Sequence, residues 1–396
     1  MIKDYILKEK DYIIEKRRWL HMHPELSLKE FETASLIERE LDSFGIPHER
    51  VGETGVYGWI DGKKTSASED RRCIALRSDI DALPMEDLTE NDYASTVKGV
   101  CHSCGHDGHT ATLLAAARIL KEMESEFSGR IKLFFQQAEE VCGGGRQFVA
   151  AGLMDDVQRV YGAHVSPRID SGKVSLTPGP VNACSDHFRI IVHGKSSHAA
   201  TPDLGIDALY IASQIVVALQ TIVARSTSPL DTVVVGVGMM QSGTAYNIVA
   251  DTAQLDGTVR AFDPGSREHT AERIREIAEA SAAMYGASIE FTYERHADPL
   301  INDPTVVSEV TNVTEKLIAP ENIIHDMEKS LSADDFAEYL QKAPGMYAYV
   351  GTRNVKKDPE TATPYHNGHF NIDEDALLLS CNIYVDYALA FLNKEI

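Results

Sequence analysis

The eight residues HSCGHDGH, 102–109, constrain the fold of this chain more than any other segment. They contain three histidines, a cysteine and an aspartate, and zinc-like metals take imidazole and thiolate ligands. Cys104 and His106 are one residue apart, just before an alanine-rich helical pattern, so a tight turn can point both side chains to the same side. His102 and His109, taken alone, fit a surface loop better. The fold must therefore bring further ligands to this turn.

Candidates for these further ligands follow two apolar runs of strand type. Glu139 and Glu140 end the run GRIKLFFQQAEE, and His164 closes the run VQRVYGAH. Burying two adjacent carboxylates without partners is costly, and a metal site relieves that cost. Neighbouring side chains point in different directions, so one glutamate could bind metal while the other holds an attacking water. A solvated strand end is the alternative for the pair, and a structural role is the alternative for His164.

The segment RSDIDALPMED adds two carboxylates at the end of another strand. Alternation places Asp79 and Asp81 on the same face. One of them could orient a ligand histidine or approach the metals from behind the ligands. A surface turn rich in acidic residues is the alternative.

The length of 396 residues favours two domains, because single cores stop growing near ~250–300 residues. Helical and strand patterns alternate up to about residue 165, which predicts an α/β fold with a helix-covered mixed, largely parallel sheet. Chemistry gathers at the carboxyl ends of the strands in such sheets. The segment SLTPGPVNAC, 175–184, then breaks the pattern, because Pro-Gly-Pro cannot continue a helix or a central strand.

The stretch after this break has the order β-α-β-β-α-β, which predicts a ferredoxin-like α+β unit of ~110 residues. The alternation of helices and short strands resumes at Asp298. We therefore expect a catalytic domain formed by residues 1–184 and 298–396, with residues 185–297 inserted as a second domain.

Composition excludes several classes of partner. The net charge of -22 argues against nucleic acid and against an anionic membrane surface. The N-terminal segment reads as a charged amphipathic helix and lacks the apolar run of a signal peptide. No stretch is expected to reach the ~18 apolar residues of a membrane span. Six cysteines in a chain of this length do not indicate a disulfide framework, so we expect free thiols and a cytoplasmic location.

Taken together, the motifs resemble those of the dinuclear metal-dependent amidohydrolases of the aminoacylase and hippurate hydrolase type. This family includes the plant auxin-amino-acid conjugate hydrolases and is related to glutamate carboxypeptidases. The resemblance covers nearly the whole chain and keeps the order of the family. It is carried by HMHPELSLKEFET, RSDIDALPMED, HSCGHDGH, QQAEE, YGAHV, GKSSHAATPDLGIDAL, GTAYNIVADTAQLDGTVRAF and HNGHFNIDEDAL.

The resemblance implies a role for each matching residue. Glu139 matches the general base. His366 matches the last ligand, because the family places its histidine four residues before a phenylalanine, here Phe370, and His369 is the alternative. The remaining metal ligands implied by the match are Cys104, His106, Glu140 and His164.

The resemblance also implies roles in the inserted domain. His198 matches a lid histidine that steadies the carbonyl oxygen, and Asn247 and Arg260 match lid residues that can meet the carboxylate of the substrate. Asn247 could instead cap a strand end, and Arg260 could pair with an acidic neighbour. Departures from the family pattern are QQAEE, VCGGGR, the Asn-Gly before His369, and Asp203 where a histidine is frequent; they affect substrate preference more than metal chemistry.

The implied reaction is the hydrolysis of N-acyl amino acids to a carboxylic acid and a free amino acid. The implied cofactors are two divalent metal ions, zinc or manganese, with cobalt or nickel possible. The implied partner is a second copy, in a homodimer formed through the inserted domain. A peptidase cutting dipeptides or C-terminal residues is one alternative. A silent binding protein has no need of the Glu139–Glu140 pair, and a structural zinc loop requires a closed Cys/His set.

Overall fold

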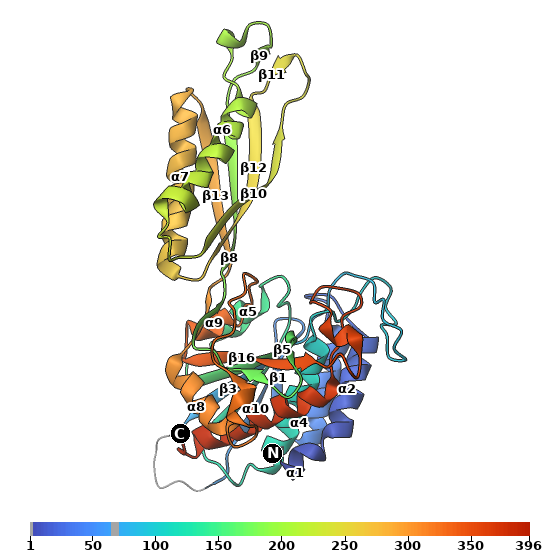
Figure 1. The fold of residues 1–396 in the computed structure, drawn as a ribbon. Helices are drawn as coiled ribbons and strands as arrows, with labels where there is room; N and C mark the ends of the chain where they lie inside the picture. Colours follow the sequence, from blue (N-terminus) through green and yellow to red (C-terminus); the bar gives the residue numbers. More distant parts are fainter. Residues whose placement is uncertain (1–2, 65–70) are drawn as a thin grey trace. The chain divides into compact units, whose positions relative to one another are not determined.

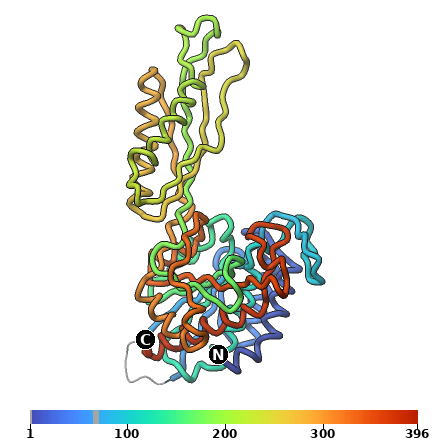
Figure 2. The backbone as a smooth tube through the Cα atoms, in the orientation of Figure 1, coloured from blue at the N-terminus to red at the C-terminus, as the bar shows by residue number. Residues whose placement is uncertain are grey.

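The computed structural model describes residues 3–64 and 71–396. Met1 and Ile2, part of the expected N-terminal helix, lie outside the described residues. The chain forms two compact units, and Figures 1 and 2 show that unit 1 combines the N-terminal and C-terminal parts of the chain. Unit 1 comprises Met1–Gly179, Ile301–Glu328 and Asp334–Ile396, and unit 2 comprises Pro180–Leu300 and Lys329–Ala333.

Unit 1 is built on a mixed sheet whose central strands β4, β3, β5 and β16 are parallel to one another. Strand β2 joins β4 antiparallel, and β6 joins β16 antiparallel. The predicted mixed, largely parallel sheet is confirmed. In sheet order the strands are β1 (His48–Val51), β2 (Gly55–Asp61), β4 (Arg130–Gln136), β3 (Cys73–Asp79), β5 (Arg159–Asp170), β16 (Gly345–Arg353), β6 (Val174–Ser175) and β15 (Ile323–Ile324).

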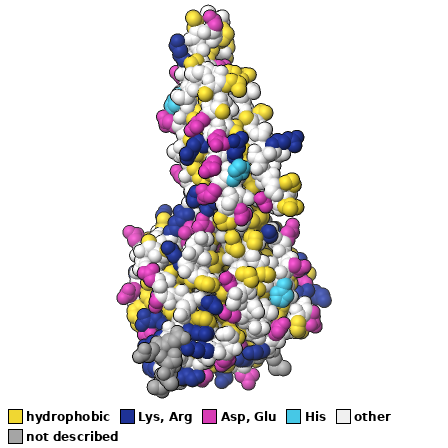
Figure 3. Space-filling model, turned by 90° about the vertical axis from the view of Figure 1, so that its left-hand side faces the viewer, with side chains coloured by type: hydrophobic (Ala, Val, Ile, Leu, Met, Phe, Trp, Pro, Cys, Tyr) yellow, Lys and Arg dark blue, Asp and Glu magenta, His cyan; other side chains and the backbone are white. Residues whose placement is uncertain are grey.

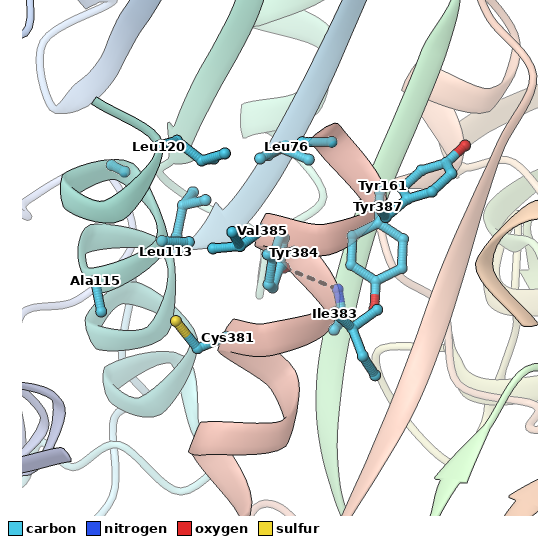
Figure 4. Packing of buried hydrophobic residues seen from close by; sticks show 14 of the residues in the cluster. Leu76, Leu113, Ala115, Leu120, Tyr161, Cys381, Ile383, Tyr384, Val385 and Tyr387 are labelled. Carbon is cyan, nitrogen blue, oxygen red and sulfur yellow. Dashed lines mark hydrogen bonds between the residues drawn. The ribbon is translucent and has the colours of Figure 1, made fainter. Parts of the chain in front are cut away.

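The core of unit 1 lies between this sheet and its helices. Helices α4 and α10 pack on β3 and on each other, and α2 packs on α4. Figure 4 shows Leu113 lying beside Val385 and Tyr384. The helices of this unit are α1 (Asp4–Leu7), α2 (Lys10–Met22), α3 (Phe31–Phe44), α4 (His106–Glu122), α5 (Gly144–Ala150), α8 (Pro304–Thr314), α9 (Ala337–Leu340) and α10 (Leu377–Leu392).

Unit 2 is a four-stranded antiparallel sheet in the order β10-β12-β8-β13, with two helices packed on one face. The chain order and the strand order are those of a ferredoxin-like fold, as predicted. Alternate residues of β8, such as Phe188, Ile190 and Val192, are buried under the helices. The elements are β8 (Ser185–His193), α6 (Ala208–Thr221), β10 (Val233–Ser242), β12 (Thr252–Ala261), α7 (Pro264–Met284) and β13 (Ser288–Ala297).

Two short strand pairs complete the fold. Strands β9 (Ser197–His198) and β11 (Ile248–Val249) pair antiparallel, and β7 (Gly179–Asn182) forms a separate two-stranded sheet with β14 (Leu300–Asn302).

Among the described residues, two helical stretches are long and apolar enough to cross a membrane by length and composition alone, whereas the sequence pattern predicted no span. One is Glu374–Leu392, where 83% of the apolar window is buried inside unit 1. The other is Ala208–Ser226, whose buried residues pack on the sheet of unit 2. Core helices pass the same test, so this is weak evidence for a span. On the surface, acidic and basic side chains are interspersed with apolar ones (Figure 3).

The structure corrects two details of the predicted strands. Strand β4 ends at Gln136, so Glu139 and Glu140 lie in the turn that follows it and not at its end. Strand β5 continues to Asp170, so His164 lies within the strand and does not close it. In both cases local apolar patterns show where a strand starts better than where it stops, because pairing with neighbours decides the end.

Candidate metal centre

The turn before α4 fixes the directions of Cys104 and His106. Gly105 adopts a left-handed conformation with a φ of 92°, and a Cβ there would lie 2.4 Å from Val165 Cγ2. Glycine is required at this position for both reasons. Cys104 and His106 are both buried. His106 Nδ1 lies 2.9 Å from the carbonyl oxygen of Asp81 and donates to it, so Nε2 is the ring nitrogen that faces the other candidate ligands.

The second histidine of the site reaches the thiol from β5. His164 donates from Nδ1 to the carbonyl oxygen of Val165 (2.7 Å), and its Nε2 lies 3.4 Å from Cys104 Sγ. Burial holds the pKa of His164 well below its ordinary value, so the ring is neutral, as a metal ligand must be. Burial, together with the nearby carboxylates of Glu140 and Glu139, holds the pKa of the Cys104 thiol well above its ordinary value. A bound cation is what would turn it into a thiolate.

The two glutamates lie in a strained turn. Ala138 and Cys142 adopt left-handed conformations, with φ values of 56° and 53°, which cost non-glycine residues on the order of 1–3 kcal/mol each. The turn is held by hydrogen bonds from the Gly143 amide to the Ala138 carbonyl (3.0 Å) and from the Ala138 amide to Glu30 Oε1 (2.9 Å). Strain of this kind persists where the surrounding structure dictates it, and here it aims Glu139 and Glu140 at one point.

That point is the free nitrogen of His106. Glu139 Oε2 and Glu140 Oε1 each lie 3.9 Å from His106 Nε2. Burial raises the pKa of Glu139 well above its ordinary value, and the charges of Asp334 and Glu140 raise it further. Burial alone would lower the pKa of His106, but Asp79 and Asp81 outweigh it and raise the pKa to about 10. The centre therefore has an excess of negative charge, which a cation would relieve.

The structure separates the two C-terminal histidines. His366 Nε2 lies 3.2 Å from Glu140 Oε2, and the His366 amide donates to the Ser103 carbonyl (2.9 Å). His369 points away from the centre, with its Nδ1 3.2 Å from Glu360 Oε1. The geometry thus brings His366, and not His369, to the candidate ligands.

The two aspartates contact the histidines of this turn on different sides. Asp79 Oδ1 accepts from His109 Nδ1 (2.6 Å), and Asp79 Oδ2 lies 3.8 Å from His106 Nε2. Asp81 Oδ1 lies 3.3 Å from His106 Nδ1, and its Oδ2 accepts from the Glu140 amide (3.1 Å). Asp81 therefore contacts both the helix start and the glutamate turn.

The histidines expected at the surface are instead buried. His109 is buried because it donates to Asp79 and accepts from the Val165 amide (2.9 Å), so it ties α4 to β3 and β5. His102 is buried as well, and burial lowers its pKa to about 4. Composition alone suggested a polar loop, but packing between strands and helices encloses it.

Within the described part of the chain, several overlapping groups of side chains place their ligand atoms within 4.8 Å of one another, and three of these groups contain candidate ligands from separate segments. His106 Nε2 and Glu140 Oε1 are buried and lack a hydrogen-bond partner among the described residues. Leaving such atoms unpaired is costly, and a divalent cation would satisfy both. These three groups are Cys104, His106 and His164; Cys104, Glu140 and His366; and His106, Glu139 and Glu140.

Sequence reasoning missed two supports of this centre. Arg17 of α2 is buried, and its Nε donates to Asp107 Oδ2 (2.8 Å), beside the candidate ligand His106. His21, one helical turn on, donates from Nδ1 to the same oxygen (2.8 Å). The signal was present: Arg17 and His21 share a helix face with the apolar Ile13.

A second missed support lies under the glutamate turn. Arg77 is buried in β3, and its guanidinium lies 2.6 Å from Asp79, 3.1 Å from Asp335 and 3.4 Å from Asp334. Burial raises the pKa of Asp335 to about 7, although Arg77 opposes the shift. The adjacent acidic pair in SADDF was the signal, of the same kind as the glutamate pair.

The remaining candidates lie in unit 2. His198 is exposed, and its neighbour Ala199 donates from its amide to the Asn247 carbonyl (3.0 Å), so His198 and Asn247 lie together. Arg260 donates to Thr258 Oγ1 (2.6 Å). Arg260 lies near the opposite end of β12, roughly 25 Å along the strand from its start beside Asn247. The structure therefore does not bring Arg260 to His198 and Asn247 within one chain.

Comparison with known proteins gives one consistent result. Residues 75–390 match peptidase family M20/M25/M40. The chain is 38% identical to thermostable carboxypeptidase 2 of Saccharolobus solfataricus, over 99% of this chain and 98% of that one. It is 36% identical to N-acetylcysteine deacetylase of Bacillus subtilis, over 96% and 97%.

A solved structure supports the same assignment. It is described as a dinuclear metal binding peptidase from the M20 family of Bacillus subtilis, and it superimposes with a TM-score of 0.84 at 33% identity, covering 98% of this chain and 99% of that one. The chain therefore belongs to peptidase family M20/M25/M40.

Proposed function

We propose that this enzyme hydrolyses the amide bond of N-acyl amino acids at a centre of two divalent metal ions, releasing a carboxylic acid and a free amino acid. The observation that carries the proposal is the set of buried ligand atoms converging at the end of the sheet, with His106 Nε2 and Glu140 Oε1 unpartnered. The residues proposed to hold the ions are Cys104, His106, Glu140, His164 and His366.

The donor set fits such ions. It combines thiolate, imidazole and carboxylate, with Asp81 placed against Nδ1 to orient His106. A thiolate favours zinc, while imidazole and carboxylate also accommodate manganese, cobalt or nickel. When bound, the ions supply Lewis acidity to the amide carbonyl and to water.

Glu139 is proposed as the general base. It lies in the centre but has Glu140 beside it as the ligand, so the two adjacent carboxylates divide the work. Glu139 takes a proton from the attacking water and returns it to the leaving nitrogen. The cations would lower its pKa from the raised value that burial and Asp334 impose, and so keep it ionised.

The residues of unit 2 are proposed to complete the substrate site. His198 would donate to the developing oxyanion, and Asn247 or Arg260 would meet the substrate carboxylate. Arg260 lies far from His198 and Asn247 along β12. Asn247 and Arg260 can therefore bind the same substrate carboxylate only if they come from two different chains.

A homodimer through unit 2 fits this separation. Strand β10 is an edge of the sheet, and Met239, Met240 of β10 and Val217 of α6 expose apolar side chains. Unpaired edges and apolar surface favour association. Size-exclusion chromatography with light scattering should give twice the chain mass, and Met239→Glu should halve it.

We also place the enzyme in the cytoplasm. All six cysteines are free thiols, and five of them are buried. A reducing compartment maintains such a set.

The nature of the substrate separates this proposal from a peptidase. The similarity to N-acetylcysteine deacetylase favours N-acyl amino acids, and the similarity to a carboxypeptidase favours peptides. The test is a panel of N-acetyl amino acids, N-benzoyl amino acids and dipeptides, assayed after loading with zinc and with manganese. We expect the highest kcat/KM on an N-acyl amino acid. Preference for dipeptides would support the peptidase instead.

A further inference from the structure

We propose that unit 2 carries a separate site for a divalent transition metal ion, formed by His187, Glu294 and His296 on the open face of its sheet. Two imidazole nitrogens and a carboxylate oxygen of these residues lie within 4.8 Å of one another. Two histidines and one carboxylate are a donor set that zinc uses where one coordination position stays open. The site belongs to unit 2 alone and does not depend on the proposed amide hydrolysis.

Strand pairing brings the three side chains together. His187 of β8 lies directly opposite Glu294 in the antiparallel pair with β13, and His296 follows two residues later. The ladder shifts register between Arg295 and Ala297, beside His296. Such irregularities re-aim a side chain relative to a regular strand. The neighbouring Phe188 points the other way, into the apolar core under the helices.

A carboxylate behind His187 sets its tautomer. His187 Nε2 lies 2.9 Å from Asp256 Oδ1, and an ionised carboxylate can only accept, so neutral His187 donates from Nε2. Its Nδ1 lone pair then faces Glu294 Oε2 at 3.7 Å. Asp256 is itself held by Gln254 (2.6 Å) and Arg189 (2.8 Å). This carboxylate–histidine arrangement is the one that orients metal-binding histidines.

The distances between the ligand atoms suit a zinc ion if the three side chains move slightly closer together. Zinc–nitrogen bonds of ~2.0–2.1 Å place tetrahedral ligand atoms about 3.3 Å apart. The observed separations are 3.7 Å for His187–Glu294 and 3.9 Å for His296–Glu294. The side chains of Glu294 and His296 are 63% and 43% exposed, so both are free to rotate by the few tenths of an ångström required.

The local charge is compatible with a cation. Arg189, the cation on this face closest in sequence to His187, is paired with Asp256, and Arg295 is paired with Glu268 (2.6 Å). Among the described residues, the ion-pair contacts of the Glu294 carboxylate are with the two histidines.

The same two strands offer a matched control. His193 of β8 and Glu290 of β13 form a histidine–carboxylate pair 2.9 Å apart on the same face. Removing His193 changes the surface charge and the histidine count as removing His296 does, but leaves the proposed ligands in place.

The test is zinc content of the full chain after equilibrium dialysis at micromolar zinc, measured by elemental analysis. We expect the wild type and His193→Ala to hold one more ion per chain than His296→Gln and Glu294→Gln. The ions of unit 1 cancel in this difference, and hydrolysis of the best substrate should be unchanged in all three variants. Asp256→Asn should weaken the affinity of the site by roughly 10–100-fold.

Two outcomes overturn the proposal. One is equal zinc content in the wild type, His296→Gln and Glu294→Gln. The other is a difference that shows only at millimolar zinc, which would mean an adventitious ion only. Both substitutions lie on an exposed edge strand, so circular dichroism should show an unchanged fold and keep either result decisive.

Discussion

The interiors of the two units solve the problem of buried charge in opposite ways. Unit 2 has an apolar core between its sheet and helices, and its buried carboxylate Asp186 is satisfied by Arg267 (2.7 Å) and Tyr293 (2.6 Å). Unit 1 buries carboxylates and histidines together at the end of its sheet and leaves His106 Nε2 and Glu140 Oε1 without partners among the described residues. Protein groups complete the polar interior of unit 2, whereas unit 1 needs something from outside.

This difference predicts where stability depends on metal. Unpaired buried polar groups cost about 1–3 kcal/mol each, and more when charged. A ligand that binds only the folded state returns that free energy. Unit 1 should therefore respond to chelation, and the folding of unit 2 should not depend on it.

The largest effect expected is the loss of turnover in Glu139→Gln. The amide keeps the shape of the side chain but cannot accept a proton, and general-base catalysis is worth typically 10²–10⁴-fold. Metal content, measured by elemental analysis, should stay at the wild-type value. The comparison variant is Glu140→Gln, which should lose metal as well as activity. Near-wild-type turnover in Glu139→Gln would show that another group is the base.

The next effect concerns the support under the metal loop. Arg17→Met leaves Asp107 buried without its cation, and breaking such a pair costs about 3–5 kcal/mol. Arg17 also lies 3.2 Å from Asn371, in the segment that follows His366, so it joins two segments that carry candidate ligands. We expect the free energy of unfolding, measured with urea, to fall by that amount and the metal Kd to rise roughly 10–100-fold.

Arg159→Met is the control for Arg17→Met. Arg159 makes a bidentate ion pair with Glu309 (2.9 and 2.7 Å) in the same unit, away from the candidate ligands. Its loss should lower stability less, because the pair is partly exposed, and should leave the metal Kd unchanged. An equal change of Kd in both variants would mean that Arg17 acts through global stability alone.

The corresponding test of unit 2 is Leu255→Ala. Leu255 is fully buried in β12 beneath the helices, and such truncations cost about 2–5 kcal/mol, depending on how far the cavity collapses. Metal content and the metal Kd should not change. A loss of metal in this variant would contradict the division between the two interiors.

Sequence patterns predicted unit 2 more completely than unit 1 for the same reason. Alternation in β8 and helical spacing in α6 are local signals, and they were enough for a ferredoxin-like fold with an apolar core. The ligand-type residues Cys104, His106 and Glu140 were also visible, because each stands in a short polar cluster.

The supports of the centre depend on contacts that local patterns do not contain. Arg17 and Asp107 are 90 residues apart, and Arg77 and Asp335 are 258 apart. A charged residue on a helix or strand is normally solvated, so the charged amphipathic pattern of the N-terminal segment gave no reason to expect Arg17 to be buried. Only the presence of Asp107 in three dimensions makes its burial favourable. The ends of β4 and β5 were missed for a related reason, since neighbouring strands determine them.

The smallest predicted effect concerns a buried carboxylate whose hydrogen-bond donors all come from the protein, in contrast to the carboxylates that need a metal ion. Asp87 lies in unit 1 near His21, but its carboxylate accepts from the Thr89 amide (2.9 Å), the Thr89 hydroxyl (2.8 Å) and the Ser95 amide (2.7 Å). Burial alone would raise its pKa, but the hydrogen bonds from His21, Ser95 and Thr89 outweigh burial and lower it. Asp87 therefore resembles the satisfied Asp186 of unit 2.

A carboxylate with a lowered pKa in the folded state stabilises the fold above its unfolded pKa of ~3.9 and loses that contribution as the pH falls through the folded value. Asp87→Asn should thus cost about 1–3 kcal/mol near pH 7, measured by urea unfolding of the metal-free protein. The difference from the wild type should shrink as the pH falls below ~4. Adding a chelator should change this difference in unfolding free energy little, because the groups that hold the Asp87 carboxylate are hydrogen-bond donors of the chain itself. A difference that appears only in the metal-loaded protein would place Asp87 with the metal centre and weaken the contrast between the two interiors.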